Sequence, residues 1–340
     1  MIVETMALTP QVVVEIGQAH DGSVGILHSL IDAIASTGAP VIKFQMHFAG
    51  AESSRFDEFR IQFSRVDATR FDYWKRMELS VPQWREIKSH CESVGCEFLC
   101  TPFSVKAVRV LDEIGASRVK VGSGDIGNHL LLEAIRRTGK PVILSSGMST
   151  FDELDEAVAF FRAASGGVTV MQCTSEYPVL PERWGLNLIP LLRERYGVPV
   201  GLSDHSGTIF PSLAAVALGA ELVEVHGTFD RRMFGPDASS SLEMEELKIL
   251  VEGVRQIALA GAHPQAKSDV SRVEQMRRLF GRSLTASRDI PQGTSISFHD
   301  LEAAKPAGHG LAPSRYIDLL GKRAKRDLMK GTFILESDFE

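Results

Sequence analysis

The sequence predicts an α/β fold, specifically a (β/α)8 or TIM barrel, on the basis of three observations. Short apolar runs rich in β-branched residues alternate with amphipathic helical stretches up to about residue 260. Eight such strand–helix units fit into roughly 260 residues, the usual size of this barrel. Polar side chains follow nearly every apolar run. A doubly wound open sheet is the alternative, but it usually has fewer strands, and no G-x-G-x-x-G follows the first strand.

The first four units extend to residue 138. We expect strands at 12–16, 41–45, 97–101 and 118–122, and helices at 23–37, from Pro82, from Ser104 and at 129–138. The connection after the second strand, residues 46–80, is unusually long and carries several aromatic residues among its charges, including Phe56, Phe59, Phe63, Phe71, Tyr73 and Trp74. We expect it to pack as a lid or a subunit contact.

The last four units and the tail complete the prediction. Strands are expected at 141–145, 168–173, 199–205 and 222–226, with helices beginning near Ser149 or Thr150 and at 188–196, 209–219 and 243–260. Glu153 lies three residues after Thr150, as in a capping box. We therefore assign a barrel domain to 1–262, a linker with a short helix to 263–281 and a β-rich module to 282–340. That module has a marginal core for its size and should dock on its own barrel or a partner's.

Composition excludes several classes of protein. The chain has 340 residues, 44% hydrophobic, and a net charge of -6, which gives no sign of nucleic-acid binding. No apolar run is long enough to span a membrane, and the first residues lack the basic and apolar regions of a signal peptide, so we expect a cytoplasmic protein. The four cysteines form no C-x-x-C pair and are expected to be reduced thiols.

Two histidines, His205 and His226, lie at the ends of consecutive predicted strands. In a parallel barrel both imidazoles would enter the same mouth, where barrel enzymes have their active sites. Two converging imidazoles favour a divalent-metal site with other positions open to water or substrate. The alternative is that each is an ordinary hydrogen-bonded histidine.

Other strand ends also supply polar groups: Glu15, Lys43, Gln45, Thr101, Lys120, Ser123, Asp125, Ser145, Ser146, Thr174, Ser175, Tyr177, Ser203 and Glu224. Two lysines and several hydroxyls around one cavity favour a phosphorylated or carboxylated substrate. Alternatively, Lys43 and Lys120 pair only with the barrel's carboxylates. No G-x-S-x-G nucleophile elbow is present. Lys120 also leaves open a Schiff-base aldolase.

Eight motifs in order resemble the sialic acid synthase family, the phosphoenolpyruvate-dependent synthases of N-acetylneuraminate and related nonulosonic acids. They are Glu15-Ile-Gly-Gln-Ala-His20, Lys43-Phe-Gln45, Thr101-Pro-Phe103, Lys120-x-x-Ser123, Leu144-Ser-Ser-Gly-Met148, Cys173-Thr-Ser-Glu-Tyr-Pro178, Gly201-Leu-Ser-Asp-His-Ser206, and Val225-His226 with Phe234-Gly-Pro-Asp237. The tail from about residue 282 resembles the antifreeze-like (SAF) domain that ends these synthases.

The resemblance implies a condensation of phosphoenolpyruvate with an open-chain aldose such as an N-acetylmannosamine-like hexose. It implies Mn2+ or Mg2+ on His205 and His226, and catalytic roles for Glu15, Asp125 and Lys120. Phosphoenolpyruvate would be held by Lys43, Thr101, Lys120, Ser123, Ser145 and Ser203, with Ser175 among the substrate-binding residues, and the sugar would face Gln45, Tyr177 and Asp237. The family is a dimer in which each SAF domain caps the partner's barrel, so a domain-swapped homodimer is expected.

Two residues depart from the family pattern. Asp125 stands where the family usually has Glu, so its carboxyl group is one methylene shorter. Lys305 stands where the SAF domain normally presents an arginine to the sugar, and lysine lacks the planar fork. These departures indicate an unusual acceptor sugar, or else a non-catalytic homologue that only binds sugar or partners.

Overall fold

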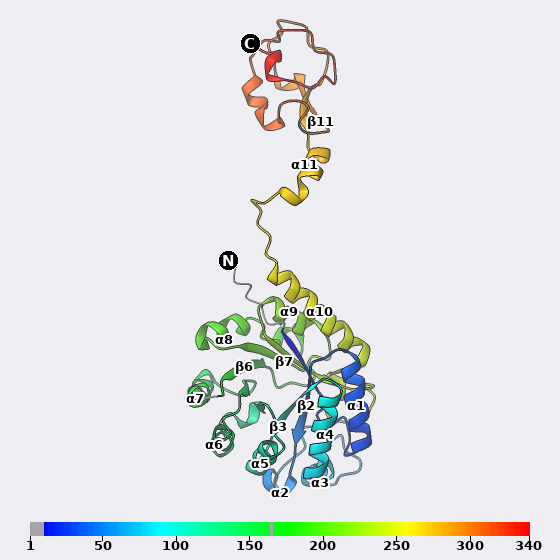
Figure 1. The fold of residues 1–340 in the computed structure, drawn as a ribbon, viewed down its shortest axis with the longest axis vertical. Helices are drawn as coiled ribbons and strands as arrows, with labels where there is room; N and C mark the ends of the chain where they lie inside the picture. The colour runs from blue at the N-terminus through cyan, green and yellow to red at the C-terminus, as the bar shows by residue number, and fades with distance from the viewer. Residues whose placement is uncertain (1–9, 164–165) are drawn as a thin grey trace. The chain divides into compact units, whose positions relative to one another are not determined.

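The computed structural model describes residues 10–163 and 166–340 and confirms the barrel (Figure 1). Eight parallel strands are hydrogen-bonded in chain order, and β1 also pairs with β8, which closes the ring. The strands are β1 (Gln11–Glu15), β2 (Val41–Met46), β3 (Glu97–Pro102), β4 (Val119–Val121), β5 (Val142–Ser145), β6 (Val168–Cys173), β7 (Val200–Asp204) and β8 (Leu222–Gly227). A short strand that the sequence did not predict, β9 (Ser241–Leu242), extends the sheet beside β8.

Helices surround these strands (Figure 1). They are α1 (Val24–Ser36), α4 (Val81–Ser93), α5 (Val105–Glu113), α6 (His129–Arg137), α7 (Phe151–Arg162), α8 (Leu188–Tyr196), α9 (Phe210–Ala217) and α10 (Met244–Ala262). Local sequence explains their ends. Thr150 and Glu153 form the predicted capping box of α7, and Gly197 ends α8 in the left-handed conformation. In the described part of the chain, no helix is both long and apolar enough to cross a bilayer.

The strand register divides the inside of the barrel into two levels. The first inward-facing positions carry apolar residues that form one buried cluster: Val13, Val41, Leu99, Ile143, Met171 and Leu222. Because strand side chains alternate between faces, the next inward positions lie two residues further on. These positions are buried and mostly polar, and comprise Glu15, Lys43, Thr101, Ser145, Cys173, Ser203 and Glu224. The barrel is therefore apolar below and polar towards the carboxyl ends of its strands.

The β2–α4 connection (residues 47–80) is partly helical and packs against the barrel. It contains α2 (Ala49–Glu52) and α3 (Arg70–Met77), which the sequence did not predict. Its aromatic rings are in mutual contact, and the Phe63 ring lies 5.5 Å from the ring of Phe234 in the loop after β8. Arg76 forms ion pairs with Asp67 inside the connection and with Asp21 after β1. These contacts hold the connection over the barrel's mouth, as expected of a lid.

The second compact unit begins at Pro264. It contains α11 (Glu274–Phe280) and a two-stranded antiparallel sheet of β10 (Ser283–Ala286) and β11 (Leu301–Ala304). The rest of the predicted β-rich module forms few regular strands. Phe298 begins a 3-10 turn, η5 (Phe298–Asp300), capped by Ser297. Arg323, Ala324, Leu328 and Phe333 take part only in single bridges. The unit has its own small apolar core, which includes Leu284, Ile296, Leu328 and Ile334.

This unit contains an internal repeat that sequence reasoning missed. The segment Arg288–Leu301 and the segment Arg326–Phe339 share Arg, Asp, Gly, Thr, Ile and Asp at equivalent positions. Their contacts are also equivalent. Arg288 donates to the buried Asp300 at 2.7 Å, and Arg326 donates to the buried Asp338 at 2.8 Å. In each copy of the repeat, the buried carboxylate is the last residue of a short 3-10 turn and accepts the backbone N–H of the residue that precedes the turn.

Candidate active site

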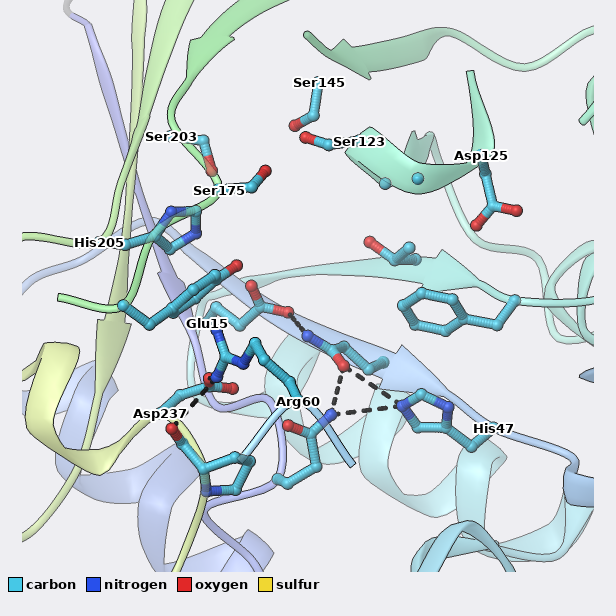
Figure 2. A pocket seen from close by; sticks show the side chains of 18 of the residues that line it. Glu15, His47, Arg60, Ser123, Asp125, Ser145, Ser175, Ser203, His205 and Asp237 are labelled. Atoms are coloured by element: carbon cyan, nitrogen blue, oxygen red, sulfur yellow. Dashed lines mark hydrogen bonds and ion pairs between the residues drawn. The ribbon is translucent and has the colours of Figure 1, made fainter. Parts of the chain in front are cut away.

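The polar level of the barrel opens into a cavity of about 490 Å³ at the carboxyl ends of the strands (Figure 2). Of the residues predicted for the site, thirteen line it: Glu15, Lys43, Gln45, Thr101, Lys120, Ser123, Asp125, Ser145, Ser175, Tyr177, Ser203, His205 and Asp237. They come from six of the barrel strands and from the loops after β4, β6, β7 and β8. The structure thus brings together residues that are far apart in the sequence.

A buried network of alternating charges forms the floor of the cavity. The Lys43 ammonium lies 2.6 Å from Glu15 Oε2 and 3.1 Å from Glu224 Oε1. Lys120 lies 2.5 Å from the same Glu224 oxygen, and Ser203 donates to that oxygen at 3.2 Å. The predicted pairing of both lysines with barrel carboxylates is therefore present. It does not exclude anion binding, because both lysines also line the cavity.

The charges in this network shift one another's pKa values. Burial by itself raises the pKa of Glu15, but Lys43 and His226 outweigh it and hold that pKa below its usual range. Burial lowers the pKa of Lys43, but Glu15 and Glu224 outweigh it and raise that pKa. Burial lowers the pKa of Lys120, and Glu224 only partly offsets the effect. Glu15 and Lys43 therefore stay ionised at neutral pH.

A group of small polar residues lies beside the two lysines. Ser123, Ser145, Ser175 and Cys173 all line the cavity, and the backbone N–H of Gly147 donates to Ser123 Oγ at 3.1 Å. The Ser145 hydroxyl is buried and has no hydrogen-bond partner among the described residues. Buried hydroxyls normally have a partner, so the free Ser145 indicates a ligand oxygen. We call the hydroxyl groups of Ser123, Ser145 and Ser175, together with the backbone N–H of Gly147, the hydroxyl cluster.

His205 and His226 lie side by side, with ring centroids 5.5 Å apart. His205 Nδ1 donates to the carbonyl oxygen of Thr174 at 3.1 Å, so the lone pair of a neutral imidazole would lie on Nε2. His226 Nε2 is 3.5 Å from Glu15 Oε2. Unlike His205, His226 lines a smaller neighbouring cavity rather than the main one.

The donor chemistry of this pair fits a divalent cation held by two protein ligands. No cluster of three or more His, Cys, Asp or Glu side chains suited to a metal occurs in residues 10–163 and 166–340. Water or substrate oxygens would therefore supply the remaining ligands, which is how open catalytic sites are built.

Just beyond the end of β2 lies His47, a cavity residue that sequence reasoning missed. His47 is stacked between Trp74 and Phe103, with ring centroids 4.0 and 4.6 Å away. His47 Nδ1 lies 2.6 Å from Glu52 Oε1, and its Nε2 lies 3.2 Å from Gln45 Oε1. Gln45 in turn donates to Glu15 at 2.7 Å. The sequence does contain a signal for His47, because residues 41, 43, 45 and 47 are alternate positions that face the inside of the barrel.

Asp125 and Lys305 are the two departures from the family pattern. Asp125 lies on the cavity wall in the 3-10 turn η1 (Ser123–Asp125), where burial raises its pKa and Asn128 partly offsets the rise. Lys305 belongs to the second unit, where its ammonium lies 4.9 Å from the centroid of the Phe280 ring. Its contact with a sugar stays a prediction.

Arg60, from the β2–α4 connection, is a further residue of the site that the sequence did not predict. Its Nη2 donates to Asp237 Oδ1 at 2.7 Å, and its guanidinium carbon lies 3.9 Å above the Tyr177 ring (Figure 2). Nothing in the irregular sequence of this connection distinguishes Arg60 from its other arginines, Arg55, Arg65, Arg70 and Arg76.

Comparison with known proteins finds relatives that cover most of this chain. N,N'-diacetyllegionaminic acid synthase of Campylobacter jejuni is 33% identical over 334 residues, which cover 96% of this chain and 98% of that protein. N-acetylneuraminate-9-phosphate synthase of Homo sapiens is 31% identical over 328 residues, which cover 96% and 91%. The crystal structure of N-acetylneuraminic acid (sialic acid) synthetase from Leptospira borgpetersenii, in complex with citrate, is 31% identical with a TM-score of 0.70, over 78% of this chain and 90% of that one.

Family models assign nearly the whole sequence. Residues 30–265 match the NeuB family and residues 281–340 match the SAF domain. The resemblance to sialic acid synthases is thereby confirmed, and with it the SAF character of the C-terminal unit. The chain belongs to the NeuB family and ends in a SAF domain.

Proposed function

We propose that this protein condenses phosphoenolpyruvate with an open-chain aldose to give a 2-keto-3-deoxy sugar acid and inorganic phosphate. C3 of phosphoenolpyruvate forms a bond to the aldehyde carbon, whose oxygen takes up a proton. Water adds at C2, and the bond between C2 and the ester oxygen breaks, so that phosphate leaves. The observation that carries the proposal is a single cavity with buried lysines and hydroxyls beside a histidine pair and a wall of amide, carboxyl and phenol groups.

The lysines and the hydroxyl cluster would hold phosphoenolpyruvate. Its phosphate and carboxylate need several donors, and Lys43, Lys120, Ser203 and Thr101 face the same space as the hydroxyl cluster. The free hydroxyl of Ser145 leaves a donor for the ligand's oxygens. The missing side chain of Gly147 lets Ser123, Cys173 and Ser175 pack close to its backbone.

The sugar would lie against the opposite wall, towards Gln45, Tyr177 and Asp237. His205 and His226 would hold Mn2+ or Mg2+, and such a cation, when bound, polarises an aldehyde carbonyl. Asp125 is suited to donate a proton to the aldehyde oxygen, because burial raises its pKa. Glu15 stays ionised beside Lys43 and His226, and would orient the attacking water by accepting a hydrogen bond.

A Schiff-base aldolase is the second candidate, because burial lowers the pKa of Lys120, which favours a nucleophilic amine. Two assays separate the candidates. The condensation predicts phosphate release from phosphoenolpyruvate that requires an aldose and Mn2+ or Mg2+ and stops with EDTA. The aldolase predicts metal-independent trapping of pyruvate on Lys120 by borohydride. Trapping without aldose-dependent phosphate release would overturn the proposed condensation.

We also propose that the active form is a homodimer in which the SAF domain of one chain completes the cavity of the other. The small apolar core of the C-terminal unit supports this, because a unit of that size gains stability by docking.

A further inference from the structure

We propose that Arg60 determines acceptor specificity by binding an uncharged amide or hydroxyl oxygen of the aldose, and that this protein therefore uses an uncharged aldose rather than a sugar phosphate. The inference rests on the proposed condensation and adds to it the chemical class of the acceptor and the residue that selects it. The relatives' names leave this choice open, since one of them is named as a synthase of a 9-phosphate and another is not.

Arg60 has donors to spare. Both of its hydrogen bonds, to Asp237 Oδ1 at 2.7 Å and to the Pro236 carbonyl at 3.3 Å, are made by Nη2. Within the described part of the chain, Nε and Nη1 of Arg60 have no hydrogen-bond partner, and the side chain is 40% exposed at the cavity wall. A guanidinium presents five N–H groups in a fixed plane, so several remain for a ligand.

Contacts on two sides restrain the guanidinium in this position. Its central carbon lies 3.9 Å from the centroid of the Tyr177 ring, a cation–π contact. Its chain neighbour Phe59 contacts Phe63 and Tyr73, with ring centroids 5.6 and 6.1 Å away. A donor whose orientation is fixed before binding discriminates between ligands better than a mobile one. Arg60 also joins Tyr177 to Asp237, two residues predicted to face the sugar.

The charges around Arg60 disfavour a second phosphate. Its own charge is already balanced by Asp237, and the nearby Arg70 is balanced by Asp57 at 3.2 Å. Glu52 and Asp125 add further carboxyl groups to the same cavity. The two lysines at the other end of the cavity are also paired, but there the hydroxyl cluster and Ser203 offer an anion further hydrogen-bond donors. A dianionic sugar phosphate at the Arg60 end would displace Asp237 and face several carboxylates, which costs affinity.

The test is steady-state phosphate release with three kinds of acceptor: 2-acetamido aldoses such as N-acetylmannosamine, their 2-hydroxy counterparts, and the corresponding 6-phosphates. Wild type should prefer an uncharged acceptor. Arg60→Gln should raise the KM for that aldose by about ten- to a hundred-fold, the effect of losing a hydrogen bond from a charged donor. The KM for phosphoenolpyruvate should stay within about two-fold. Arg60→Lys should recover only part of the loss, because it keeps the charge without the fork.

Arg65→Gln is the matched control, because Arg65 is exposed in the same connection and does not line the cavity. It should behave as wild type. Equal rises in both KM values for Arg60→Gln would overturn the proposal in favour of a purely structural role. Preference for a 6-phosphate would overturn it as well.

Failure of the condensation itself is recognised separately. If wild type releases no phosphate with any aldose, calorimetric titration of the aldoses into the protein with phosphoenolpyruvate replaces the kinetic readout. If an uncharged aldose binds, and binds about ten-fold more weakly to Arg60→Gln, the role of Arg60 is supported even though the proposed condensation is rejected. Equal binding by both proteins, or no binding by either, would overturn the Arg60 assignment.

Discussion

The arrangement of charges on the cavity floor depends on one carboxylate. Glu224 Oε1 accepts from both Lys43, at 3.1 Å, and Lys120, at 2.5 Å, and all three side chains are buried. Its other oxygen has no partner among the described residues. Buried charges are tolerated only when they are paired, so Glu224 favours the charged form of both ammonium groups. The proposed anion binding depends on those charges.

Glu224→Gln should therefore shift the pH dependence of phosphoenolpyruvate use. Without the carboxylate, the pKa values of Lys43 and Lys120 fall, and the ammonium groups lose their protons at lower pH than in wild type. The alkaline limb of kcat/KM for phosphoenolpyruvate should move to lower pH. The free energy of unfolding should drop by about 3–5 kcal/mol, the cost of breaking a buried pair.

Glu221→Gln, at an exposed residue just before β8, is the control. An unmoved alkaline limb would show that these charges do not bind the anion.

At the scale of the elements, the inward alternation of the strands explains why much of the site could be predicted. A strand whose apolar inward residue is Val41 must also turn Lys43 and Gln45 inward, and the same rule extends to His47. Arg60 escaped prediction because the β2–α4 connection has no such period. Its position follows from packing among Phe59, Phe63 and Tyr73, which only the folded chain shows.

The C-terminal unit was harder to predict for a related reason. Its backbone is held by single bridges and short capped turns rather than by long ladders, so periodicity carries little information. The carboxylates of Asp300 and Asp338 take the place of strand pairing by accepting backbone N–H groups. The repeat in which they lie is visible in the sequence only once those two positions are aligned.

The loop after β5 should be sensitive to a single added methyl group. A Cβ at Gly147 would lie 2.5 Å from Ser175 Oγ and 2.9 Å from both Cys173 Sγ and Ser123 Oγ. Gly147→Ala must therefore push the hydroxyl cluster apart. We expect the KM for phosphoenolpyruvate to rise by about ten-fold or more, as when one hydrogen bond to a charged ligand is lost. The aldose KM should change much less.

Gly50→Ala provides the comparison, because a Cβ there has nothing within 4 Å. It should leave both KM values unchanged. An effect of Gly147→Ala on the aldose alone would place phosphoenolpyruvate elsewhere in the cavity and would contradict the roles proposed for Ser123 and Ser145.

At the scale of the whole molecule, the chain is two compact units with separate cores, and the candidate site lies in the first. The main cavity of this unit already has donors for an anion, the imidazole of His205 and a guanidinium. The proposed dimer adds Lys305 from a second chain. The proposed roles of Arg60 and Lys305 differ in one respect: Arg60 would act on the sugar in the cavity of its own chain, and Lys305 on the sugar in the partner's cavity.

Mixing two variants distinguishes action within one chain from action across the dimer. Glu15→Gln should abolish turnover, and Lys305→Met should raise the aldose KM, so each homodimer is poor at low aldose concentration. In a mixed dimer, the intact barrel of the Lys305→Met chain would be completed by the intact SAF domain of the Glu15→Gln chain. Activity at low aldose should then exceed that of either variant alone after the chains are exchanged by mild denaturation and refolding. If the SAF domain served its own barrel, or no barrel, every chain would retain its own defect and mixing would restore nothing. Arg60→Gln in place of Lys305→Met should not be rescued by Glu15→Gln, because its defect lies in the same barrel as the working Glu15.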